Sequence, residues 1–175
     1  MLEAFATSRT PPAPTDLTVC LTFAERQKSR HKTQTACGQT LGWFIERGQV
    51  LSDGDFLVCQ NGVAVRVVAA PELVSRVVSN EPFLLMRAAY HLGNRHVPLQ
   101  LNRDSLIYAQ DHVLDAMLGG LGLEVTRCES PFQPENGAYH GKAVIQIAQG
   151  HGVAHSHGSH HHSHSHSHSH SHSHE

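Results

Sequence analysis

The order of apolar patterns between residues 72 and 128 restricts the possible folds more than any other feature of the sequence. Strand-like and helix-like patterns follow one another there as β-α-β-β-α-β, the arrangement of a ferredoxin-like split βαβ unit. Right-handed crossovers in the two βαβ halves place both helices on one face of an antiparallel sheet. The predicted strands are 72–79, 96–101, 105–109 and 123–128, and the predicted helices are 81–92 and 112–118.

Capping residues indicate where the two helices begin and end. Asn80 is a favourable N-cap for the first helix, and Pro82 suits its first turn. Gly93 is expected to be the C-cap of the same helix. Asp111 is expected to open the second helix. Pro98 has no backbone N–H, so the strand that contains it is expected at an edge of the sheet.

Residues 16–70 contain no helical period and predict a small all-β domain. From Leu17 to Phe23, apolar and polar residues alternate, which is the period of a half-buried strand. Asn61-Gly62 lies between two apolar runs and is a strong hairpin signal, because both residue types tolerate positive φ.

Two parts of the N-terminal region carry weaker signals. Residues 1–15 are rich in proline and are expected to be loose. Residues 25–35 are polar and fit either a strand with one solvated face or a loop.

Residues 151–175 contain twelve histidines and eight serines and have almost nothing apolar to bury. Such a segment cannot offset about 1–2 kcal/mol of backbone entropy per ordered residue, so it is expected to be disordered. Its alternation of histidine with serine differs from the contiguous run of a purification tag and favours a native segment. The predicted fold class is therefore α+β, with an N-terminal all-β domain at 1–71, a ferredoxin-like domain at 72–150 and a disordered His-rich tail at 151–175.

The spacing of the tail histidines suits metal binding. In an extended chain, residues i and i+2 point the same way about 6–7 Å apart, so two imidazoles can turn onto one ion. Neutral imidazole is a ligand for Ni(II), Zn(II) and Cu(II). The candidate metal ligands in the tail are His151, His155, His157, His160, His161, His162, His164, His166, His168, His170, His172 and His174.

The charged residues argue against a nucleic-acid partner. Lysine and arginine number 13 and aspartate and glutamate 15, which gives a formal net charge of −2 with histidine neutral. Because histidine titrates near a pKa of about 6.5, the charge of this chain depends on pH. There is no fixed basic excess of the kind that binds nucleic acid.

The sequence is expected to belong to a cytoplasmic protein that does not enter a membrane. Its N-terminus lacks the basic and apolar regions of a signal peptide, and no apolar run is long enough to cross a bilayer. The four cysteines form no Cys-x-x-Cys pair and are expected to be mostly buried thiols in a reducing cytosol. They are Cys20, Cys37, Cys59 and Cys128.

The most specific motif is Gly-Asn-Arg-His at residues 93–96, which is followed by Val-Pro-Leu at 97–99. A second stretch, Arg-Gly-Gln-Val-Leu-Ser-Asp-Gly-Asp at 47–55, precedes the Asn-Gly hairpin signal. Together with the His-rich tail, these motifs resemble the UreE family of urease accessory proteins, which act as nickel metallochaperones. The resemblance extends over residues 16–130, roughly.

The resemblance implies a homodimer joined through the ferredoxin-like domain. The family histidine that matches His96 lies at the two-fold axis, so two copies of His96 would share one Ni²⁺. The implied partners are the urease accessory GTPase and the apo-urease accessory complex, to which nickel is passed. The resemblance also implies an N-terminal β-domain like a peptide-binding module.

Two further histidines near the motif are candidate ligands. His91 lies at the end of the first predicted helix, where the helix dipole alone also favours a histidine. His112 lies in the first turn of the second helix, where some family members carry His-x-His. This chain has Gln110 in place of the first histidine, which weakens the case for a separate site there. His31 and His140 carry no motif.

Two functions from different classes remain open. A nickel metallochaperone needs the interface site at His96, whereas a Ni/Zn storage or buffering protein needs only the tail. An enzyme is not expected, because the sequence has no His-Glu-x-x-His and no carboxylate pair set on an imidazole cluster. It also lacks a Gly-x-x-x-x-Gly-Lys-[Ser/Thr] loop, so GTP hydrolysis must come from a partner.

Overall fold

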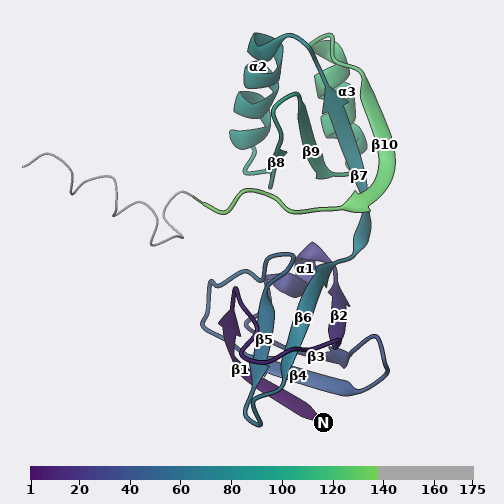
Figure 1. Ribbon diagram of the computed structural model, residues 1–175. Helices are drawn as coiled ribbons and strands as arrows, with labels where there is room; N and C mark the ends of the chain where they lie inside the picture. The colour runs from purple at the N-terminus through teal and green to yellow at the C-terminus, as the bar shows by residue number, and fades with distance from the viewer. Residues whose placement is uncertain (138–175) are drawn as a thin grey trace, which may run out of the picture. The chain divides into compact units, whose positions relative to one another are not determined.

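The computed structural model describes residues 1–137, which form a six-stranded sheet and then a four-stranded sheet with two longer helices (Figure 1). The predicted α+β class is confirmed, as is the order of an N-terminal β-domain before a mixed domain. The His-rich tail and His140 lie outside the described residues.

The first sheet is built from residues of the N-terminal half. The order across this sheet is β2-β6-β5-β1-β4-β3. The pairs β1–β4 and β2–β6 are parallel, and the other pairs are antiparallel. The elements are β1 (Leu2–Ser8), β2 (Thr18–Leu21), α1 (Phe23–Arg26), β3 (Arg30–Gln34), β4 (Thr40–Phe44), β5 (Phe56–Cys59) and β6 (Ala64–Ala69).

Strand β1 contradicts the prediction that residues 1–15 are loose. It lies between β4 and β5, and Leu2 and Ala4 are buried in one cluster with Trp43. Leu2 pairs with Leu41, far along the chain. Apolar residues alternate over only a few positions in β1, and the strands that pair with it are distant in sequence. The prolines that follow β1 therefore led to the prediction of a loose segment.

Residues 25–35, which fitted either a strand or a loop, form the end of α1 and the strand β3. Thr22 caps α1 by a capping box, in which its backbone N–H donates to the Glu25 carboxylate at 2.8 Å. Arg26 is fully buried and donates through Nη1 to the Leu51 carbonyl at 3.2 Å and to the Gln133 side chain at 2.7 Å. A buried guanidinium thus joins the loop before β5 to the segment after β10.

The Asn61-Gly62 hairpin is confirmed, since β5 and β6 pair antiparallel around it. Only Gly62 has positive φ, at 79°, so the turn differs from a two-residue turn with two left-handed positions. The Gly62 N–H donates to the Cys59 carbonyl at 3.0 Å, and the Cys59 N–H donates to the Val63 carbonyl at 2.8 Å. The loop is therefore a turn closed by a left-handed glycine.

The second sheet has the order β10-β7-β9-β8 with antiparallel neighbours, which is the predicted ferredoxin-like topology. Leu85, Leu92 and Leu118 from the two longer helices share one buried cluster with Val77 and Tyr108 of the sheet. Both helices therefore cover the same face (Figure 1). The elements are β7 (Pro71–Val78), α2 (Pro82–Gly93), β8 (Gln100–Leu101), β9 (Ser105–Ala109), α3 (His112–Gly120) and β10 (Val125–Pro131).

The ends of α2 and the start of β8 differ from the prediction. The N-cap is Glu81 rather than Asn80, and it makes no side-chain cap hydrogen bond. Gly93 is the last helical residue, not the C-cap. The strand predicted at 96–101 is reduced to the two residues of β8, because the chain is still completing the turn after α2 and Pro98 has no N–H to donate.

The start of α3 is predicted correctly. The Asp111 carboxylate accepts hydrogen bonds from the N–H groups of Val113 and Leu114, at 2.7 and 3.2 Å. This is the ordinary N-cap geometry for aspartate. A cap of this kind depends only on neighbours in sequence, which is why the pattern reveals it.

The expectation of mostly buried thiols is wrong for two of the four cysteines. Cys59 is buried and Cys128 is half-buried, but Cys20 and Cys37 are exposed. Cys20 alternates with buried neighbours along β2 and so faces outward, and Cys37 lies in the turn between β3 and β4.

Among residues 1–137, no helix is long and apolar enough to cross a membrane.

A buried carboxylate connects α3 to the sheet. Asp115 Oδ1 accepts hydrogen bonds from the hydroxyls of Ser75 at 2.6 Å and Tyr108 at 2.8 Å. Its Oδ2 accepts from Arg127 Nε at 2.9 Å and from Gln110 Nε2 at 3.4 Å. Burial opposes ionisation, but these hydrogen bonds outweigh it and hold the pKa of Asp115 below its usual range.

We expect Asp115→Ala to lower the free energy of unfolding by about 2–4 kcal/mol, because the Ser75 and Tyr108 hydroxyls would stay buried without their acceptor. Urea unfolding followed by circular dichroism measures this loss. The matched control is Asp111→Ala, which removes the N-cap of the same helix and is expected to cost about 1 kcal/mol. Equal losses in the two variants would contradict a special role for the buried network.

The pKa of Asp115 also sets the pH dependence of stability. Because it is lower in the folded protein, the ionised carboxylate stabilises the fold. This contribution is complete above the pKa of an unfolded aspartate, about 3.9, and is lost as pH falls through the lower folded value. The stability difference between the natural protein and Asp115→Asn should be constant above about pH 5 and shrink below about pH 4. Denaturant titrations across this range test it, and a difference that does not change with pH would contradict it.

Candidate metal centre

Helix α2 ends in a turn that carries His96. The Val97 N–H donates to the Leu92 carbonyl at 3.2 Å, and the His96 N–H donates to the Gly93 carbonyl at 2.9 Å. Leu92 is fully buried, and Val97 packs against the same cluster. These two hydrogen bonds and this apolar contact define a Schellman motif with His96 at its left-handed position.

The backbone of His96 is unusual for a histidine. Its φ is 56°, and within residues 1–137 it is the one residue other than glycine with positive φ. Glycine is the residue that most often takes this position, because a Cβ there costs about 1–2 kcal/mol. The His96 side chain is exposed, so burial of the ring does not explain its presence. Strained positions of this kind cluster at functional sites.

Arg95 supports the same turn. Its Nη1 donates to the His91 carbonyl at 2.9 Å, one of the carbonyls that the end of α2 leaves free. A positive charge here also interacts favourably with the C-terminal end of the helix dipole. The motif residues around His96 therefore fix the backbone from which its imidazole projects.

The other two candidate ligands within the described residues, His91 and His112, lie on different helices. His91 is half-buried on α2, with its ring edge-to-face with Tyr90 at 5.4 Å between centroids. His112 is exposed at the first position of α3. Gln110, two residues before His112, donates through Nε2 to the Asp115 carboxylate at 3.4 Å. Residues 1–137 contain no group of three or more His, Cys, Asp or Glu that could hold a metal ion together.

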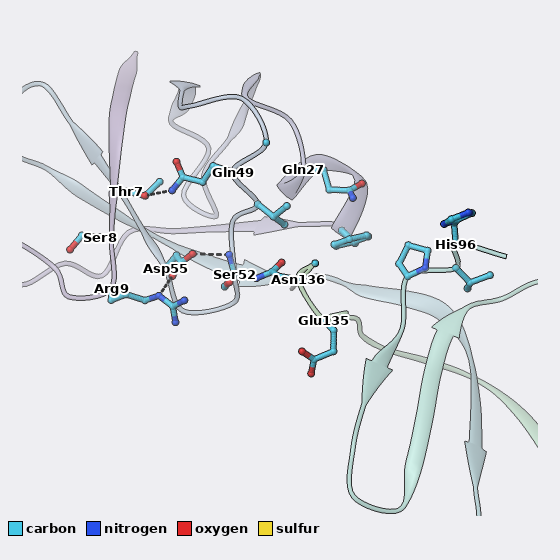
Figure 2. A pocket seen from close by; sticks show the side chains of 16 residues that line it. Thr7, Ser8, Arg9, Gln27, Gln49, Ser52, Asp55, His96, Glu135 and Asn136 are labelled. Carbon is cyan, nitrogen blue, oxygen red and sulfur yellow. Dashed lines mark hydrogen bonds and ion pairs between the residues drawn. The ribbon is translucent and has the colours of Figure 1, made fainter. Parts of the chain in front are cut away.

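A group of polar residues of the first sheet and its loops is drawn in Figure 2. Within this polar group, Arg9 Nε lies 3.3 Å from the Asp55 carboxylate, which also accepts from the Ser52 N–H at 2.7 Å. The Asp55 carboxylate is thus bonded to partners within the first domain.

One surface feature of α2 was not predicted from the sequence. Phe83, Met86 and Tyr90 are 67%, 60% and 66% exposed, and their spacing places them along one side of the helix. This apolar stripe leads toward the turn that carries His96. The signal was present in the sequence, because apolar residues surround the helix on more than one face, whereas a helix that covers a single core needs only one.

The comparisons with known proteins decide the family. Models of the UreE urease accessory protein match the chain at residues 1–70, as the N-terminal domain, and at 72–174, as the C-terminal domain. The chain belongs to the UreE family. The UreE of Saccharophagus degradans is 62% identical over 127 residues, which are 73% of this chain and 76% of that protein.

Two other UreE proteins show the same relationship. The UreE of Teredinibacter turnerae is 54% identical over 145 residues, which are 81% of this chain and 92% of that protein. The UreE of Proteus mirabilis is 51% identical over 125 residues, which are 71% of this chain and 78% of that protein. These relatives are urease accessory proteins, which agrees with the prediction that this UreE chain is not an enzyme.

Replacement of His96 by glycine tests the strain at the turn. We expect His96→Gly to raise the free energy of unfolding by up to about 1 kcal/mol, because relief of the left-handed strain exceeds the added flexibility of the unfolded chain. His96→Ala keeps the Cβ and is expected to leave stability near that of the natural protein. Urea unfolding measures both variants. A glycine variant less stable than the alanine variant would contradict the Schellman geometry.

Proposed function

We propose that this chain is a nickel metallochaperone, which binds Ni(II) through His96 and the His-rich tail and delivers it for assembly of the urease active site. The observation that carries the proposal is the left-handed backbone of His96. A histidine kept where glycine would cost less free energy is kept for its side chain. Its imidazole is exposed and is a suitable nickel ligand.

One imidazole fills only one coordination position, so a second donor is required. The stripe formed by Phe83, Met86 and Tyr90 supports a homodimer as the source, since a large exposed apolar surface favours association. A two-fold contact brings the same residues of both copies together. Because α2 carries both the stripe and the turn, such a dimer would let two His96 side chains share one Ni²⁺. The remaining open positions suit a protein that must release its cargo.

The tail at 151–175 supplies further nickel ligands in this proposal. Its twelve histidines act as overlapping pairs that raise the number of ions held per chain. Zn(II) and Cu(II) are alternative ions, because imidazole binds all three. His91 and His112 are secondary ligands at most, since neither belongs to a group of three or more possible metal ligands within residues 1–137.

The proposed partners are the urease accessory GTPase and the apo-urease accessory complex, and the proposed setting is the cytoplasm. The sequence has no phosphate-binding loop of the Gly-x-x-x-x-Gly-Lys-[Ser/Thr] type. Nucleotide hydrolysis during nickel transfer is therefore assigned to the GTPase.

Storage or buffering of Ni(II) or Zn(II) is the alternative function, and the composition of the tail favours it. In that case the tail alone matters, and the strained histidine has no role. The two functions differ in which deletion affects urease.

Urease activity at limiting nickel separates the two functions. In the metallochaperone, His96→Ala and His96→Gly are both expected to impair urease activation, even though the glycine variant is the more stable protein. A chain that ends at Gly150 is expected to lose most of its nickel capacity but to keep about one ion per dimer. For a storage protein, loss of the tail is expected to impair urease activation, and the His96 substitutions are expected to have no effect. Normal activity in both His96 variants would rule out the proposed delivery site.

The dimer has its own test. Met86→Lys places a charge in the apolar stripe and is expected to convert the dimer to a monomer, because an unpaired charge at an interface is costly to desolvate. Sedimentation equilibrium measures the mass. The matched control is Val78→Lys, at an apolar residue of β7 that is 50% exposed and lies outside the stripe. A Met86→Lys protein that stays dimeric would contradict the proposed interface.

A further inference from the structure

The second sheet has one edge with no hydrogen-bonded neighbour among residues 1–137. Its order is β10-β7-β9-β8, so β10 and β8 are the two edge strands. Beside β8, the Glu135 N–H donates to the Leu99 carbonyl at 2.7 Å, so the chain after β10 is already bonded on that side. Figure 1 shows β10 at the outer side of the sheet, and within the described residues its backbone bonds only to β7.

The bonds of β7 show which of its residues face β10. At one end of β7, the Gln110 N–H donates to the Leu73 carbonyl at 3.2 Å, and at the other end the Ser79 N–H donates to the Asp104 carbonyl at 3.1 Å. Both bonds continue the register between β7 and β9. Because bonding directions alternate along a strand, the odd-numbered residues of β7 bond to β9 and the even-numbered residues bond to β10.

The same alternation defines the free backbone groups of β10. Val74, an even-numbered residue of β7, pairs with Cys128. Cys128 therefore bonds inward, and the N–H and C=O groups of Val125, Arg127 and Glu129 point to the open edge.

The side chains along this edge carry opposite charges. Arg127 and Glu129 are exposed, and they share one face of β10 because they are two residues apart. Arg127 donates through Nε to the Asp115 carboxylate at 2.9 Å, and within residues 1–137 its two terminal nitrogens make no hydrogen bond. Glu129 forms no ion pair in the same part of the chain.

This edge is complementary to itself. If two β10 strands pair antiparallel about a two-fold axis at Cys128, Arg127 of each copy lies opposite Glu129 of the other. Both residues of that pair have outward-pointing backbone groups, so the backbone bonds and the charge pairs form in the same register. Edge charges of a single sign would instead oppose such pairing.

We propose that β10 pairs with β10 of a second copy of this chain, antiparallel and centred on Cys128. The contact needs no metal, lies apart from the α2 stripe and does not depend on the proposed nickel function. Pro131 has no N–H and ends the pairing on either side. So short a contact buries little area, and we expect a dissociation constant on the order of 0.1–1 mM. It would therefore be absent at the low micromolar concentrations that suit measurement of the stripe dimer.

Sedimentation equilibrium of the full chain in EDTA tests the association. The mass measured at low micromolar concentration is expected to double as the concentration approaches about 1 mM. Hydrogen exchange of the Arg127 and Glu129 amides should slow over the same range, because these donors are open in the unpaired strand. No doubling, or a doubling that requires added metal, would overturn the proposal.

Charge reversal tests the side-chain pairs. Glu129→Arg places two arginines opposite each other and is expected to weaken the association at least tenfold, because repulsion replaces attraction. Glu46→Arg makes the same change in net charge at an exposed residue of the first domain and is expected to leave it unchanged. Equal association of the two variants would contradict the pairing of Arg127 with Glu129.

Proline tests the backbone bonds. Glu129→Pro removes an outward N–H without removing a bond to β7, so the fold is expected to persist. Glu129→Gln keeps the N–H and is expected to weaken the association only severalfold. The mass should not double in the proline variant. Doubling in this variant, with a circular dichroism spectrum like that of Glu129→Gln, would show association without strand pairing and overturn the proposal.

A disulfide tests the register. Cys128 would face itself in a non-bonded pair, where the Cα atoms of antiparallel strands lie about 4.5 Å apart, within the range that a disulfide spans. In Cys20→Ser/Cys37→Ser, diamide is expected to join two copies, taking one hydrogen from each Cys128 thiol and being reduced to the hydrazine. The further substitution Cys128→Ser should abolish the covalent dimer. A chain whose mass doubles but which diamide does not cross-link would contradict a contact centred on Cys128.

Discussion

The backbone carbonyl of Leu92 is the point on which the proposed metal centre depends. The Leu92 side chain is fully buried between helices and sheet, while its carbonyl accepts hydrogen bonds from both Arg95 and Val97. Core packing therefore fixes the turn, and the turn fixes the direction in which His96 leaves the chain. An imidazole on a flexible loop would require the backbone to be ordered when the metal binds, whereas the backbone of His96 is fixed beforehand.

The residues of helix α2 fall into three groups with different surroundings. Leu85, Ala88 and Leu92 build the core, Phe83 and Tyr90 remain outside it, and the last turn presents the motif. A helix that served the core alone would carry polar residues on its outer side. The proposed dimer contact and the proposed nickel ligand therefore both depend on one helix of this chain.

Local signals in the sequence were sufficient where the structure depends on neighbours in sequence. The cap at Asp111, the hairpin at Gly62 and the βαββαβ order are of this kind. The sequence did not predict β1, because its partners are distant, or the shortening of β8, because the turn after α2 extends into that segment. His96 was found through its motif. Its left-handed backbone was not, since histidine gives no signal for a position that glycine usually fills.

The strained turn places stability and chemistry in opposition at one residue. Random mutation and selection for heat resistance or expression would favour replacement of His96 by glycine, because the strain of the left-handed backbone falls when the Cβ is removed. If His96 binds nickel as proposed, selection in an organism that depends on urease would remove the same variants. A library enriched only for robust folding would therefore accumulate proteins that have lost the proposed nickel ligand at residue 96.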